Sequence, residues 1–156
     1  IDAGVDVILF ETMGHLEEIE IALETVKDLN HTIWLSLIMK DKDHILSGHR
    51  INDVFMLADK NIDCLMLNCN TIAKTNETLE IIKDNWINSW GVYPNLGLSE
   101  PEPDGEIEEK VQETDFRETI FKYLNMNPKI IGSCCGSSPM HIKMIKEMMK
   151  KLFLSE

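Results

Sequence analysis

Lysine and arginine are scarce in this chain, and long hydrophobic runs are missing. The 156 residues carry 15 Lys and Arg against 27 Asp and Glu, a formal net charge of −12. Because phosphate groups are bound by clustered positive side chains, this balance argues against nucleic acid and anionic membranes as partners. No apolar run approaches the roughly 18 residues that span a bilayer, and the start, IDAGVDVILFETM, lacks the basic flank of a signal peptide. The sequence therefore predicts a cytoplasmic protein.

The chain also lacks a glycine-rich phosphate loop and an initiating methionine. Its 44% apolar and 27% charged residues suit one soluble domain with a sizeable core. A recognisable strand begins within a few residues of Ile1. We therefore expect this domain to be part of a longer chain.

Short apolar runs alternate with helical patterns five times along the sequence. Strands are predicted at 5–10, 32–39, 64–67, 90–94 and 129–132, and helices at 15–30, 51–60, 75–86, 114–126 and 139–153. Strands that are apolar on both sides and separated by helices indicate a parallel sheet covered by helices. Right-handed crossovers leave a doubly wound sheet and a barrel as candidates, and the pattern alone favours neither.

Three of the four cysteines follow predicted strands. Cys69 follows the third strand, and the adjacent Cys134 and Cys135 follow the fifth. Because the carboxyl ends of parallel strands meet at one edge of the sheet, we expect these thiols to converge. Cys64 stands at the start of its strand, where a thiol usually behaves as a small buried hydrophobe. In a reducing compartment, disulfide bonding is the weaker interpretation of this set.

Three converging thiols suit a borderline-soft cation, and catalytic zinc keeps three protein ligands and one open position. Gly132 and Gly136 flank the cysteine pair and would permit a sharp backbone turn there. The spacing matches no zinc-finger pattern, however, and two alternatives remain. The adjacent pair could be two buried thiols or a strained vicinal disulfide.

The segment GSCCGSSPMHI, from residue 132 to 142, resembles the GGCCG-x-x-P-x-H-I signature of the homocysteine S-methyltransferase family. LNCN at 67–70, YPNLG at 93–97 and FETMGHLEEIEIA at 10–22 resemble further motifs of that family in the same order. The resemblance implies a (β/α)8 TIM barrel, to which this chain supplies about the last five units. Residues 1–156 would then be the C-terminal portion of the barrel domain, and the N-terminal remainder would be its partner.

The resemblance also implies site residues. Cys69, Cys134 and Cys135 would bind zinc, and Glu11 would lie near the substrate's amino group. Asn70 and Asn95 fall at positions that border the family's pocket, although each could equally be a strand-end turn residue. One departure is Ser133, which replaces the second glycine of GGCCG.

The function that the resemblance implies is zinc-dependent transfer of a methyl group to the thiol of homocysteine, giving methionine. The zinc-bound thiolate would be the nucleophile. The methyl donor stays open among S-methylmethionine, S-adenosylmethionine, betaine and a folate-cobalamin system. The alternative is a catalytically inactive metal-binding or interaction fragment of such a barrel. A third, weaker reading is a thiol redox protein that uses Cys134 and Cys135.

Overall fold

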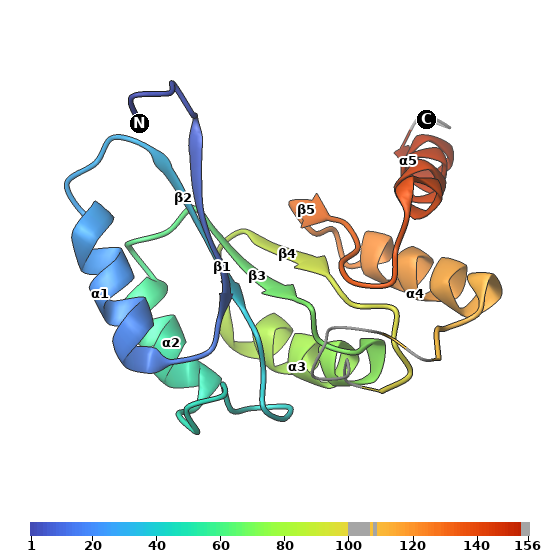
Figure 1. The fold of residues 1–156 in the computed structure, drawn as a ribbon, viewed down its shortest axis with the longest axis horizontal. Helices are drawn as coiled ribbons and strands as arrows, with labels where there is room; N and C mark the ends of the chain where they lie inside the picture. The colour runs from blue at the N-terminus through green and yellow to red at the C-terminus, as the bar shows by residue number, and fades with distance from the viewer. Residues whose placement is uncertain (100–106, 108, 154–156) are drawn as a thin grey trace.

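The fold is a five-stranded parallel sheet whose strands are joined by helices (Figure 1). The computed structural model describes residues 1–99, 107 and 109–153. In chain order the elements are β1 (Val7–Met13), α1 (Leu16–Val26), β2 (Thr32–Leu37), α2 (Ile51–Ala58), β3 (Cys64–Asn68), α3 (Ile72–Asn85), β4 (Trp90–Tyr93), α4 (Glu113–Asn125), β5 (Ile130–Ile131) and α5 (Pro139–Phe153). The five predicted strand-helix units are confirmed.

The strands lie in the sheet in the order in which they occur in the chain, from β1 to β5. A doubly wound sheet reverses its strand order at a switch point, whereas a barrel adds each strand beside the previous one. The observed order is therefore that of a barrel wall. This order decides between the two architectures that the sequence pattern left open.

The hydrophobic core lies between the sheet and its helices. In β2 and β3, alternate leucines point to the helices and are fully buried: Leu35, Leu37, Leu65 and Leu67. They pack with apolar side chains of α1 to α3, such as Ile19, Val54 and Leu79. Each buried side chain of this size contributes roughly 1.5–3 kcal/mol relative to its exposed state. No helix in the described part of the chain is both long and apolar enough to cross a membrane.

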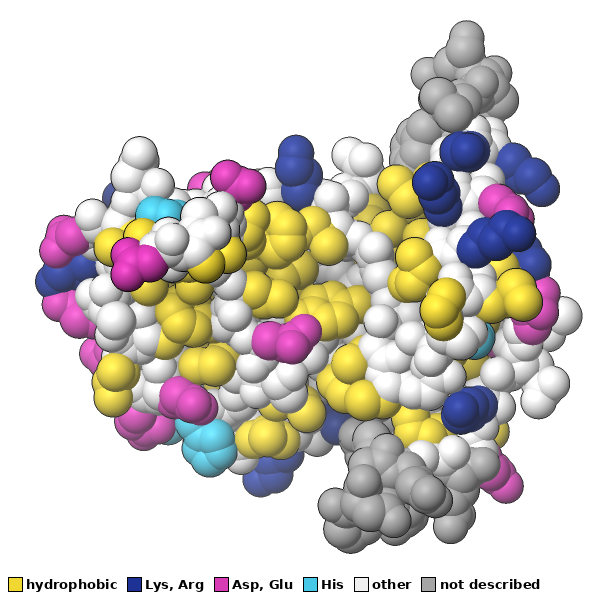
Figure 2. Space-filling view, turned by 45° about the horizontal axis from the view of Figure 1, so that its top comes forward, with side chains coloured by type: hydrophobic (Ala, Val, Ile, Leu, Met, Phe, Trp, Pro, Cys, Tyr) yellow, Lys and Arg dark blue, Asp and Glu magenta, His cyan; other side chains and the backbone are white. Residues whose placement is uncertain are grey.

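The other face of the sheet, the inner face, is more open. Figure 2 is tilted so that the top of Figure 1 faces the reader. It shows hydrophobic side chains across the middle of the molecule. The first predicted strand, 5–10, was expected to be buried, but Val5 is 47% exposed and Leu9 of β1 is 38% exposed. The expectation fails because β1 is an edge strand, and no helix in the described part of the chain covers its inner face.

Strand β1 also extends beyond its predicted end at Phe10, through a bulge. Phe10 pairs with Leu35 and Met13 with Leu37, so three steps along β1 match two along β2. Thr12 absorbs the extra residue with a φ of 60°. Phe10 and Met13 therefore both pack toward the helix-side core. The two polar residues between them, Glu11 and Thr12, are left to face the inner side.

Candidate metal centre

The three thiols predicted to converge lie together beyond the carboxyl ends of β3 and β5. The Sγ atoms of Cys69, Cys134 and Cys135 all lie within 4.8 Å of one another. The Sγ of Cys69 is 3.3 Å from that of Cys135 and the Sγ atoms of the adjacent pair are 3.9 Å apart. The closest thiols thus come from different strands, not from the adjacent pair.

A left-handed turn directs Cys69 into the cluster. Cys69 has a φ of 55°, a conformation that is uncommon for a residue with a Cβ. Its amide donates to the Tyr93 carbonyl at 3.2 Å, and its own carbonyl accepts a hydrogen bond from Asn95 Nδ2 at 2.7 Å. These two contacts fix the turn from the neighbouring strand β4 and the loop after it.

The same loop after β4 holds the cysteine pair. The Cys134 amide donates to the Pro94 carbonyl at 2.8 Å, and the Cys135 carbonyl accepts from the Leu96 amide at 3.0 Å. Ser137 Oγ donates to the Cys134 carbonyl at 2.6 Å and closes the turn. Residues 94–96 therefore place the thiols of β3 and β5 against each other.

The two glycines that flank the pair have different roles. Gly136 has a φ of 79°, as expected of a glycine that permits a sharp turn. Gly132 has no positive φ. It lies so close to β4 that an added Cβ would be 3.2 Å from the Tyr93 Cβ. Ser133 also lacks a positive φ, so the backbone accommodates its Cβ without strain of that kind.

The surroundings of the cluster favour neutral thiols over thiolates. Burial and the neighbouring thiols hold the pKa of Cys69 above its usual range, and burial also raises the pKa of Cys134. Three thiolates packed this closely would repel one another unless a cation lay between them. A tetrahedral zinc site with bonds of about 2.3 Å separates its sulfur ligands by about 3.8 Å. The observed distances of 3.3 and 3.9 Å lie on either side of that value, so the donor set fits the ion.

Cys64 lies apart from this cluster, as predicted. It begins β3 at the opposite edge of the sheet and is 1% exposed. Burial raises the pKa of its thiol to about 11. It behaves as a small core residue.

Glu11, the predicted contact for the substrate's amino group, lies on the inner face. Its Oε1 accepts a hydrogen bond from the Tyr93 hydroxyl at 3.0 Å, across the sheet from β1 to β4. Burial, and to a lesser degree the Glu11 carboxylate, raise the pKa of Tyr93 above its usual range. Tyr93 belongs to the YPNLG motif, but the sequence alone predicted no role for it. The available signal was its position next to last in the predicted strand 90–94, near the carboxyl end where the cysteines also follow their strands.

Beside Glu11, Thr12 is bound by Asn68, the last residue of β3. The Thr12 amide donates to Asn68 Oδ1 at 3.1 Å, and Asn68 Nδ2 donates to Thr12 Oγ1 at 2.8 Å. Ser36 Oγ in β2 donates to the same Oδ1 at 2.7 Å. A polar layer therefore crosses the inner face just below the thiols, and it holds the bulge of β1 in place.

Asn70 and Asn95 are fully buried, and backbone groups occupy their amides. Asn70 Oδ1 accepts from the Met39 amide at 2.7 Å, and its Nδ2 donates to the Leu37 and Asn68 carbonyls. Asn95 Oδ1 accepts from the Gly97 amide at 3.0 Å, while its Nδ2 holds Cys69. These contacts are those of strand-end turn residues, which was the alternative expected for both from the sequence.

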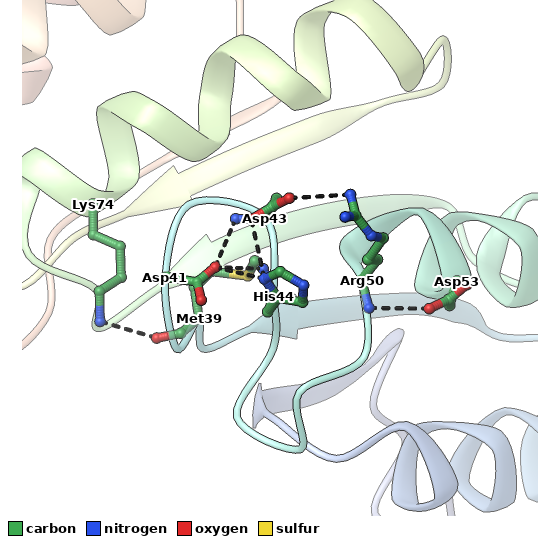
Figure 3. Close-up of polar contacts among 7 residues, drawn as sticks. All are labelled: Met39, Asp41, Asp43, His44, Arg50, Asp53 and Lys74. Atoms are coloured by element: carbon green, nitrogen blue, oxygen red, sulfur yellow. Dashed lines mark hydrogen bonds and ion pairs between the residues drawn. The ribbon is translucent and has the colours of Figure 1, made fainter.

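A second polar group, not anticipated from the sequence, lies in the loop between β2 and α2 (Figure 3). His44 Nδ1 lies 2.9 Å from Asp41 Oδ1 and 3.0 Å from Asp43 Oδ1, and Arg50 pairs with Asp43 at 3.2 Å. The hydrogen bond with His44 lowers the pKa of Asp41 to about 2. Lys74 Nζ in α3 donates to the Met39 carbonyl at the loop's start. These internally paired side chains brace the loop.

Comparison with known proteins agrees with this geometry. The sequence model for homocysteine S-methyltransferase matches residues 1–149. Homocysteine S-methyltransferase 2 of Zea mays is 29% identical over 159 residues, covering 96% of this chain and 46% of that protein. Homocysteine S-methyltransferase YbgG of Bacillus subtilis is 28% identical, covering 97% of this chain and 49% of that protein.

Solved structures of the homocysteine methyltransferase MmuM from Escherichia coli are similar in fold. The apo form superimposes with a TM-score of 0.76 at 24% identity, covering 94% of this chain and 51% of that one. The metallated form gives a TM-score of 0.75 at 25% identity, covering 94% and 46%. The chain thus spans about half the length of the relatives it matches, and the expected α/β barrel class is confirmed. With a family match over nearly all of its length, the chain belongs to the homocysteine S-methyltransferase family.

Proposed function

We propose that residues 1–156 form the C-terminal half of a barrel that transfers a methyl group to the thiol of homocysteine, giving methionine. The observation that carries this proposal is the cluster of three thiols within 4.8 Å, which two separate strands supply at the carboxyl edge of the sheet. The partner is the N-terminal remainder of the barrel, and the substrates are homocysteine and a methyl donor. We place the protein in the cytoplasm, where reducing conditions keep these thiols free.

Cys69, Cys134 and Cys135 would hold a zinc ion in this proposal. A zinc ion on three thiolates supplies a Lewis acid that favours the thiolate form of homocysteine, the nucleophile of the reaction. The chain itself orients the ligands. Residues 94–96 hydrogen-bond to backbone groups of Cys69, Cys134 and Cys135. These contacts hold the three thiols at their distances from one another.

Glu11 would receive the ammonium group of homocysteine. Its carboxylate lies on the inner face at the same edge as the thiols, and no ion pair within the described residues involves it. Asn70 and Asn95 would border the pocket by shaping its loops, since their amides are taken up by backbone groups. Amino acid and thiol would then be recognised by different strands of one sheet.

The alternative is an inactive metal-binding fragment. It is compatible with the open inner face and the two edge strands of the sheet. By contrast, a vicinal disulfide protein gains no support, because the Cys69 and Cys135 thiols are closer than the adjacent pair. An assay of methyl transfer by the complete barrel distinguishes the proposal from the inactive-fragment alternative.

The decisive experiment is zinc content per chain under reducing conditions, measured on the complete barrel and on two cysteine variants. We expect about one zinc per chain in the parent and almost none in Cys69→Ala. Cys64→Ala is the matched control and should retain the metal, because Cys64 lies at the opposite edge. Equal retention in both variants would contradict the ligand assignment, and metal retention without methyl transfer in the parent would favour the inactive fragment.

A further inference from the structure

The inner face contains one contact whose purpose the fold alone does not explain. Tyr93 in β4 reaches Glu11 in β1, although β2 and β3 lie between their strands. We propose that Tyr93 is a positioning residue that holds the Glu11 carboxylate for the ammonium group of an amino-acid thiol, and so makes the site select homocysteine over thiols without an amino group. This inference rests on the proposed function and assigns a specificity determinant within it.

Glu11 depends on Tyr93 for its orientation. The bulge at Thr12 turns Glu11 to the inner face, but a strand residue there is exposed and free to change rotamer. Within the described residues, the one hydrogen bond to its carboxylate comes from the Tyr93 hydroxyl and engages Oε1. If the glutamate side chain becomes ordered only when the substrate binds, the loss of its conformational entropy weakens binding. The phenol contact removes part of that cost beforehand.

Tyr93 is itself fixed to both segments that carry the thiols. Its carbonyl accepts from the Cys69 amide at 3.2 Å, on the β3 side. On the β5 side, Gly132 packs so closely that an added Cβ would be 3.2 Å from the Tyr93 Cβ. The contacts of Tyr93 therefore set the distance between the Glu11 carboxylate and the three thiols. Homocysteine needs such a fixed span, because its amino group and its sulfur must both reach their partners.

The chemistry of the contact also suits an ammonium ligand. A phenol is a neutral donor, so it orients the carboxylate without cancelling its charge. A lysine or arginine in the same place would pair with Glu11 and compete with the substrate. The second carboxylate oxygen is left for the ammonium group.

The test is kinetic and uses the complete barrel loaded with zinc. Tyr93→Phe removes only the hydroxyl. We compare homocysteine with 4-mercaptobutanoate, the same thiol acid without the amino group. For homocysteine we expect KM to rise about tenfold, the loss typical of a hydrogen bond to a charged group, with kcat and zinc content unchanged. For 4-mercaptobutanoate we expect no change in KM.

Two further variants keep the result interpretable. Tyr123→Phe is the matched control. Tyr123 is the other tyrosine, is fully buried in α4, and its hydroxyl has no hydrogen-bond partner among the residues that the structure describes. It should leave both KM values unchanged. Glu11→Gln should raise KM for homocysteine selectively, and adding Tyr93→Phe to it should have little further effect, because the two residues act through one contact.

Several results would overturn the inference. An equal rise in KM for both thiols would mean that Tyr93 only shapes the pocket. Unchanged KM values in Tyr93→Phe, additive effects in the double variant, or loss of zinc would each contradict a role through Glu11. Failure of the proposed function is a different outcome: the parent barrel itself would then transfer no methyl group to homocysteine.

Discussion

At the scale of single residues, the four cysteines differ sharply in environment. Cys64 is 1% exposed with a pKa of about 11, whereas Cys135 is exposed. Because the thiolate is the reactive form, the raised pKa makes Cys64 much less reactive than an exposed thiol at pH 8. We expect iodoacetamide to modify Cys135 first and Cys64 last in the metal-free protein, followed by mass spectrometry of the peptides. In urea the rates should become similar; equal rates in the folded protein would contradict the buried position.

The position of the cysteines could be predicted, but their backbone could not. A residue type and its place after an apolar run are visible in the sequence, so Cys69 and the pair at 134–135 could be assigned to one edge. The left-handed turn at Cys69 could not, because it is stabilised by Asn95, 26 positions away. The contact between Tyr93 and Glu11 spans 82 positions and was equally hidden.

At the scale of elements, the close approach of β4 and β5 contributes to the position of the cysteine pair that follows β5. Gly91 pairs with Ile130, and an added Cβ would lie 2.9 Å from both the Ile130 Cβ and its carbonyl oxygen. We expect Gly91→Ala to lower the free energy of unfolding by roughly 1–3 kcal/mol, the usual cost of overpacking, in urea titrations. Gly132→Ala is the graded control and should lose less, since its Cβ would crowd only Tyr93. A loss at Gly132 as large as at Gly91 would argue against crowding as the cause.

The ten elements follow from apolar periodicity, and their deviations follow from contacts between them. The predicted strand ended at Phe10 because Glu11 and Thr12 interrupt the apolar run. In the structure β1 continues, because Asn68 binds the Thr12 amide and hydroxyl from 56 positions away. A bulge of this kind is set by the partner strands, and a local pattern does not contain it.

At the scale of the whole molecule, an open barrel wall has two free edges. β1 and the two-residue strand β5 each have one neighbour, and the inner face exposes apolar side chains such as Leu9. Free edges and apolar faces favour association. We expect residues 1–156 alone to form oligomers in light scattering after size exclusion, and to become a 1:1 complex when the N-terminal half is added. A stable monomer that does not bind the N-terminal half would contradict the partial-barrel proposal.

The cluster joins thiols that are 66 positions apart in the chain. At a synthesis rate of about 5–20 residues per second, Cys135 leaves the ribosome about 3–13 s after Cys69. During that interval Cys69 is without the two thiols that lie beside it in the folded protein. The complete set of three thiols therefore exists only late in synthesis, so a metal taken up by the proposed site would also be bound late.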